Sequence, residues 1–152
     1  NRCISERRMV VITMGNFVKE NVNPKGNRVG DCVVRALAKA TDKTWDDVFR
    51  ELCEIAFEQK QMPNADAVWK EYAKANGFVY RPLPKVQSGE KRPRVAKFVE
   101  GLGEGTYLLR VSKHLAMAKD GRYYDSWDCG NRSLYGYWEL HPKGQNGFRE
   151  KR

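Results

Sequence analysis

The chain has 152 residues, of which 41% are hydrophobic, and it carries four tryptophans. This composition favours one globular domain over a disordered chain. No apolar run approaches the ~20 residues that cross a bilayer, and the short run at 9–14 is not followed by a small-residue cleavage site of the kind that ends a signal peptide. We therefore expect a cytoplasmic protein without membrane contact.

The net charge bears on the kind of partner, and the cysteines and histidines bear on metal binding. The net charge of +9 permits an acidic partner, either a protein or a nucleic acid. Four cysteines are too sparse for a disulfide scaffold, and His114 and His141 lack metal-ligand spacing. We expect neither a metal ion nor an organic cofactor. The basic residues gather in an N-terminal arm, a middle segment and a tail: Arg2, Arg7 and Arg8; Lys85, Lys91, Arg92, Arg94 and Lys97; Lys143, Arg149, Lys151 and Arg152.

The domain organisation is simple. We interpret residues 1–13 as an N-terminal extension or an expression remnant, 14–142 as a single domain, and 143–152 as a basic tail. Residues 16–29 are dense in turn formers and predict a loop. Neither an internal repeat nor a linker interrupts the central segment.

The first predicted helix follows this loop and runs to about Thr41. Val33 and Leu37 belong to an apolar pattern with helical spacing, and Asp31 is a residue type that caps helices by accepting bonds from the first-turn amides. Cys32 then lies at the helix N-terminus, where the helix dipole lowers the pKa of a thiol. Cys32 is therefore a candidate nucleophile, although most free cysteines are small buried hydrophobic residues.

Helices precede strands along the rest of the chain. A capping box opens a helix at Thr44, and Asn64 is expected to cap another that Gly77 ends. Pro82 suggests that the strand before it lies at a sheet edge. An α+β fold follows, with an N-terminal helical half packed against a C-terminal antiparallel sheet. The later predicted elements are a strand at 78–83, a short helix at 95–99, and strands at 106–111, 115–119, 122–127 and 134–140.

The turn at Asp120-Gly121 fixes the register of a hairpin. That register pairs Ala116 with Asp125 and places His114 opposite Trp127. His114 and Asp125 are then diagonal neighbours on one sheet face, roughly 7–8 Å apart at the backbone. Trp127 on the same face would cover them from water.

These residues could complete a catalytic site around the cysteine. Asp125 could hold one ring nitrogen of His114, leaving the other nitrogen to take the proton of Cys32. Taken singly, His114 could be a surface histidine and Asp125 a solvated carboxylate. Their conjunction with a cysteine at a helix start favours catalysis.

The sequence resembles the papain-like cysteine peptidases. The resemblance rests on Gly30-Asp31-Cys32 at a helix start, on His114 in a later strand, and on Asp125-Ser126-Trp127. Asp125 replaces the asparagine that is usual in that superfamily, as it does in the bacteriocin-processing and related bacterial and phage branches. The resemblance implies a papain-like fold and thiol-dependent acyl transfer.

One position departs from that pattern. The family usually supplies an oxyanion-binding glutamine six residues before the cysteine, where this chain has Gly26. Asn27 has the right amide chemistry and could serve beside the Cys32 backbone N–H, or it could be an ordinary turn residue.

We therefore expect a cysteine hydrolase that cleaves a peptide or isopeptide bond through Cys32, His114 and Asp125. An acyl transferase with the same triad is an alternative. So is a basic module that binds nucleic acid or an acidic protein without turnover, through the segment from Lys85 to Lys97 and tyrosines that could stack bases. Those tyrosines are Tyr123, Tyr135 and Tyr137.

Overall fold

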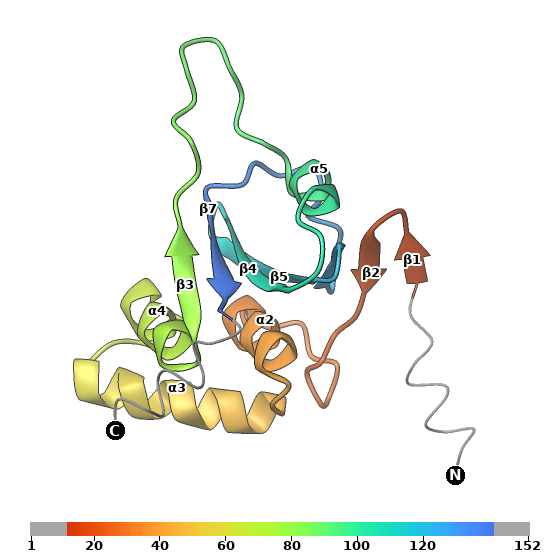
Figure 1. Ribbon diagram of the computed structural model, residues 1–152. Coiled ribbons are helices and arrows are strands. Elements are labelled where there is room, and N and C mark those ends of the chain that lie inside the picture. The colour runs from red at the N-terminus through yellow and green to blue at the C-terminus, as the bar shows by residue number, and fades with distance from the viewer. Residues whose placement is uncertain (1–11, 142–152) are drawn as a thin grey trace.

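The computed structural model describes residues 12–141 and contains four helices and a seven-stranded sheet (Figure 1). The strand order is β1-β2-β6-β5-β4-β7-β3, and every neighbouring pair is antiparallel except β2 with β6. The elements are β1 (Ile12–Met14), β2 (Phe17–Lys19), α2 (Cys32–Thr41), α3 (Trp45–Gln59), α4 (Asp66–Ala75), β3 (Phe78–Arg81), α5 (Val95–Glu100), β4 (Thr106–Val111), β5 (His114–Lys119), β6 (Arg122–Asp125) and β7 (Gly136–Leu140).

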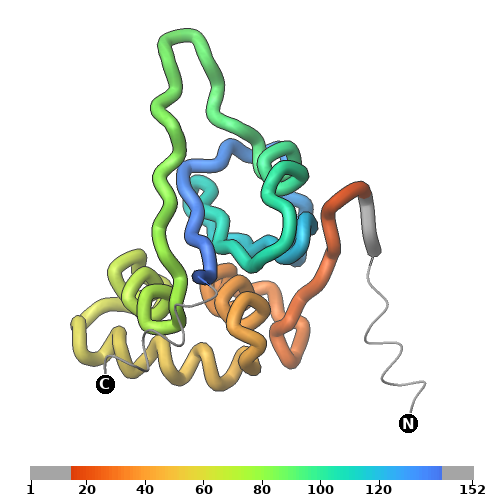
Figure 2. Tube along the Cα trace, viewed as in Figure 1, coloured from red at the N-terminus to blue at the C-terminus, as the bar shows by residue number. Residues whose placement is uncertain are grey.

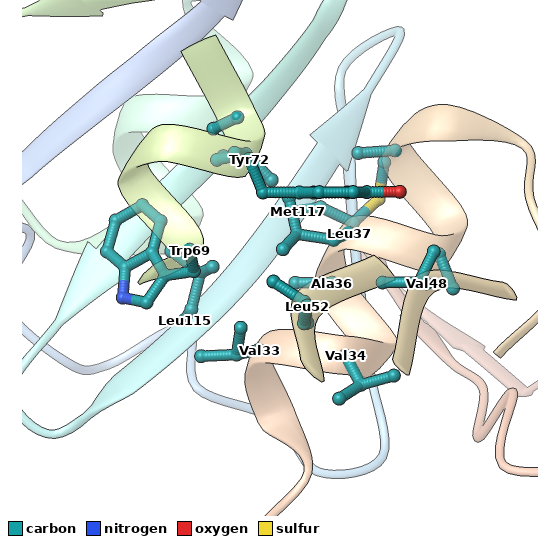
Figure 3. Close-up of a cluster of buried hydrophobic side chains, with 14 of the residues drawn as sticks. Val33, Val34, Ala36, Leu37, Val48, Leu52, Trp69, Tyr72, Leu115 and Met117 are labelled. Carbon is teal, nitrogen blue, oxygen red and sulfur yellow. The ribbon is translucent and has the colours of Figure 1, made fainter. Parts of the chain in front are cut away.

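The helical half covers one face of the sheet, which confirms the α+β arrangement. Helices α2, α3 and α4 pack together against that face, whereas α5 lies on the other (Figure 1). Leu37 of α2 and Met117 of β5 are completely buried at the centre of the larger apolar cluster (Figure 3). Ala36, Ala38 and Ala40 of α2 are buried too, and Ala36 lies beside Leu115, Ala116 and Tyr124 of the sheet.

The opposite face has its own smaller core. Val95 and Val99 of α5 are fully buried against Leu109 and its neighbours on the central strands. Apolar side chains therefore alternate between the two faces of β4 and β5, as the two-residue strand period requires. Both faces are covered, so these strands read as nearly continuous apolar runs.

The sequence predicted the strand at one edge of the sheet but not the two strands at the other edge. Strand β3 lies at an edge, as Pro82 indicated, and residues 82–94 leave it as a long segment that projects from the body (Figures 1 and 2). At the other edge two predictions are wrong: β1 includes Ile12 and Thr13 of the expected N-terminal extension, and β2 lies within the expected loop. The sheet is therefore mixed rather than antiparallel, because β2 joins β6 in parallel.

The predicted N-terminal caps of α3 and α4 have opposite outcomes. Thr44 caps α3 as expected, since its hydroxyl accepts a bond from the Asp47 backbone N–H at 3.0 Å. The prediction for Asn64 was wrong: the N-cap of α4 is Ala65, without a side-chain capping bond. The side-chain amide of Asn64 is therefore not used as a helix cap. The basic arm and tail lie outside the described residues.

Candidate active site

Cys32 is the first residue of α2 and lies where β5 begins and β6 ends. Its half-buried thiol lies beside the His114 side chain and the Leu115 backbone N–H, two hydrogen-bonding partners that favour its charged form. Burial alone would raise the pKa of Cys32, but these partners and the positive charges of His114 and Arg35 outweigh it and lower that pKa. The arrangement favours a thiolate, which is the reactive form of cysteine.

His114 lies between the thiol and a carboxylate. Its Nε2 is 2.5 Å from Asp125 Oδ2, and both residues are buried. Burial would lower the pKa of His114, but hydrogen bonds to Asp125, Cys129 and Cys32 raise it well above its usual range. A raised imidazole pKa beside a lowered thiol pKa favours a thiolate–imidazolium pair.

Asp125 is held by three donors. Besides His114, it accepts bonds at Oδ1 from Arg35 Nη1 at 2.9 Å and from the Ser126 backbone N–H at 2.7 Å. Its own carbonyl accepts a bond from the Glu20 backbone N–H at 2.8 Å, which ties the end of β6 to the chain leaving β2. The carboxylate therefore has a fixed orientation toward the imidazole.

Arg35 is a residue that the sequence reading missed. Its Nε donates to Asp31 Oδ1 at 2.8 Å while its Nη1 donates to Asp125, so one guanidinium bridges two buried carboxylates. The four-residue spacing of Asp31 and Arg35 within a helix start signals their ion pair. Nothing in the sequence signals the link to Asp125.

Asp31 does not cap α2 through its side chain, contrary to the prediction from its position before the helix. It makes no side-chain capping bond to the first turn of α2. Its carboxylate instead accepts bonds from Arg35, from Asn23 Nδ2 at 3.1 Å and from Trp45 Nε1 at 3.0 Å. Burial would raise the pKa of Asp31, but these three partners outweigh it and lower that pKa.

Trp127 lies against the imidazole. The ring centroids of His114 and Trp127 are 4.7 Å apart at an interplanar angle of 45°, and Trp127 is 39% exposed. The tryptophan thus covers part of His114 and stays partly exposed, and the Arg132 guanidinium lies over its ring, 5.5 Å from the ring centre. Trp127 covers His114 as predicted, but it does so from beyond the strand, because β6 ends at Asp125 and its ladder with β5 does not reach Trp127.

Asn27 does not line a hollow together with Cys32. It is exposed and lines a hollow with Arg35 and Trp127, whereas Cys32 lines different hollows. Its oxyanion role stays a prediction. Cys129, which the sequence reading did not single out, is fully buried beside His114, and burial raises the pKa of its thiol.

Cys129 also forms part of a possible metal-ligand set. Ligand atoms of His114, Asp125 and Cys129 lie within 4.8 Å of one another. These are atom types that Zn²⁺ accepts. However, Arg35, the Ser126 N–H and His114 already occupy the Asp125 carboxylate, so a cation would have to displace them next to a guanidinium charge. The described geometry fits an ion-paired carboxylate better than a metal ligand.

A hollow of about 130 Å³ opens beside Cys32 and His114. We name it the Lys113 hollow. Its polar lining comes from the β4–β5 turn, from β4 and from the start of α4: Lys113, Arg110, Asn64 and Asp66.

Comparison with known protein families, with curated proteins and with solved structures finds no match. Among residues 12–141, no helix is both long enough and apolar enough to cross a bilayer. The function must therefore be argued from the site itself.

Proposed function

We propose that the chain is a papain-like cysteine hydrolase that cleaves a peptide or isopeptide bond. The observation that carries the proposal is the position of His114, which lines one hollow together with Cys32 and is hydrogen-bonded through Nε2 to the Asp125 carboxylate. A nucleophile, a base and an orienting acid in hydrogen-bonded order are the requirements of thiol catalysis.

The chemistry would proceed in two steps. The Cys32 thiolate attacks the substrate carbonyl, and the His114 imidazolium gives its proton to the leaving amine, which yields a thioester acyl-enzyme. His114, now neutral, takes a proton from water, whose oxygen attacks the thioester and releases the acid and the thiol. Asp125 keeps the imidazole oriented in both steps. The Cys32 backbone N–H and Asn27 are the proposed oxyanion donors.

Two parts of the site support the first step in particular. The thiol lies at the N-terminus of a ten-residue helix, where the helix dipole favours an anion. Trp127 shields the imidazole from solvent on one side, which strengthens its interaction with the thiolate. The same atoms would support an acyl transferase if an amine, rather than water, resolves the thioester.

The test is the alkylation rate of each cysteine with iodoacetamide between pH 5 and 8, read by peptide mass spectrometry. We expect Cys32 to react far faster than Cys53 and Cys129 at pH 6, and His114→Ala to abolish this advantage. Cys53, half-buried on α3, is the internal control for ordinary exposure. A Cys32 that alkylates like an ordinary thiol with pKa near ~8.5, indifferent to His114, would refute the proposal.

The second candidate is a basic binding module without turnover. Tyr135 favours it, being 46% exposed with the Arg92 guanidinium 4.4 Å from its ring centre. Tyr123 does not, because it is buried and its ring packs against Phe17. Nucleic-acid binding that weakens steeply with salt and is unchanged in Cys32→Ala would identify this function.

A further inference from the structure

The Lys113 hollow contains one unmatched positive charge beside the nucleophile. Lys113 is exposed in the turn between β4 and β5, directly before His114, and makes no ion pair or side-chain hydrogen bond within the described residues. It lines the same hollow as Cys32 and His114. A charge in this position acts on whatever group a substrate places next to the scissile bond.

The other charges of the hollow are already matched. Arg110 forms a two-pronged pair with Asp66, with Nη1–Oδ1 at 2.8 Å and Nη2–Oδ2 at 3.0 Å. The His114 imidazolium faces the Cys32 thiolate and Asp125. Lys113 is therefore the cation whose partner is missing.

A second polar side chain of the hollow also lacks a partner. Asn64 does not cap α4, and its exposed amide makes no hydrogen bond within residues 12–141. An amide N–H₂ and an ammonium on one small hollow together offer donors to a carboxylate. A volume of about 130 Å³ suits a single acidic side chain.

We propose that the Lys113 hollow binds a carboxylate of the substrate next to the scissile bond, so that the enzyme prefers acidic polypeptides. This inference rests on the proposed function, because it assigns the hollow to the substrate of Cys32. The +9 charge of the chain acts in the same direction by attracting acidic partners from a distance.

The first test needs no substrate and uses the full chain. Iodoacetate and iodoacetamide alkylate a thiolate identically, the sulfur displacing iodide, but only iodoacetate carries a carboxylate. The quantity to measure is the alkylation rate of Cys32 by iodoacetate divided by its alkylation rate by iodoacetamide, both at pH 6. In Lys113→Gln we expect the ratio to fall about threefold to tenfold, and in Lys113→Glu further. Any change in the reactivity of the thiolate itself affects both reagents and cancels in the ratio.

The matched control is Lys85→Gln, which removes the same charge from the exposed segment that projects beyond β3 (Figure 1). We expect its ratio to equal that of the wild type. A ratio that is the same in Lys113→Gln as in the wild type, or that falls equally in both variants, would overturn the inference. Fast iodoacetamide alkylation in that case leaves the proposed function standing.

The second test uses a complex peptide mixture as the substrate, with cleavage sites read by mass spectrometry. We expect Asp or Glu to be enriched at one position next to the cleaved bond, and Lys113→Glu to shift that preference toward Lys and Arg. Cleavage without acidic enrichment would overturn the inference alone. Absence of cleavage together with an unreactive Cys32 would end both proposals. An oligonucleotide that blocks Cys32 alkylation better than a glutamate-rich peptide would assign the hollow to nucleic acid instead.

Discussion

Arg35 donates from Nη1 to Oδ1 of Asp125 across 2.9 Å, and this bond joins α2 to the end of β6. Through the same guanidinium, Asp31 at the start of α2 is linked to the carboxylate that orients His114. The relative position of Cys32 and His114 is therefore set by an ion-pair network as well as by apolar packing.

Replacing Arg35 should weaken both stability and catalysis. In Arg35→Met, Asp31 and Asp125 would lose their shared cation while remaining buried, which costs about 3–5 kcal/mol of unfolding free energy. Urea denaturation measures this loss. We also expect slower Cys32 alkylation at pH 6, because Arg35 contributes to the lowered pKa of Cys32.

Arg35→Lys is the matched variant. It keeps the charge but cannot bridge two carboxylates in the same geometry. Compared with Arg35→Met, we expect Arg35→Lys to recover part of the unfolding free energy and part of the Cys32 alkylation rate. Full restoration of both by lysine would show that charge alone matters and that the bridge does not position the site.

Neutralising Asp125 should shift the proton balance of the pair. In Asp125→Asn the amide oxygen can still accept a bond from His114 Nε2, but the negative charge that helps to raise the pKa of His114 is gone. The imidazolium would then deprotonate at lower pH. We expect the chemical shifts of the His114 ring, followed by NMR, to titrate at lower pH than in the wild type. An unchanged titration would place the main cause of the raised pKa elsewhere.

The pH–rate profile of hydrolysis should be bell-shaped and broad. The rate rises as the Cys32 thiol loses its proton, below the usual ~8.5, and falls as the His114 imidazolium deprotonates, above the usual ~6.5. A steady-state profile on any cleaved peptide measures both limbs. A profile that rises only near pH 8.5 would contradict the lowered pKa of Cys32.

Asp31 should make the fold sensitive to acid. Its folded-state pKa lies below the value in the unfolded chain, so its stabilisation is present above that unfolded value, ~3.9, and is lost as the pH falls through the folded value. Thermal melts from pH 6 to pH 2 measure the loss. In Asp31→Asn we expect lower stability at pH 6 and a smaller further decrease in acid.

The core that supports α2 offers a prediction about stability alone. Leu37 is completely buried between the helices and the sheet, so Leu37→Ala should cost about 2–5 kcal/mol. Phe57→Ala on the exposed side of α3, where the ring is 70% exposed, should change stability by about 0.5 kcal/mol or less. Equal effects in chemical denaturation would contradict the packing described for α2.

The hairpin was the most predictable part of the site. Asp120 and Gly121 both have positive φ, as a two-residue hairpin turn requires, and the observed pairs of β5 with β6 have the predicted register. Local turn chemistry therefore sufficed to place His114 and Asp125 on one face. The start of α2 at Cys32 was equally local, because it follows from apolar spacing.

The features that the sequence did not predict depend on contacts between residues far apart in the chain. Strands β1 and β2 have three residues each, too few to show a period among the turn formers around them. The bond from Arg35 to Asp125 joins positions 90 residues apart, and the approach of Cys129 to His114 depends on the path of the chain after β6. Such contacts leave no local pattern.

The 90-residue separation between Arg35 and Asp125 has a consequence for biosynthesis. During translation, α2 is synthesised long before β5 and β6, which carry His114 and Asp125. Loops of this length close slowly, because native contacts must first overcome the entropy of the intervening chain. The contacts among Cys32, His114 and Asp125 are therefore expected to form late in folding, after β5 and β6 have been synthesised.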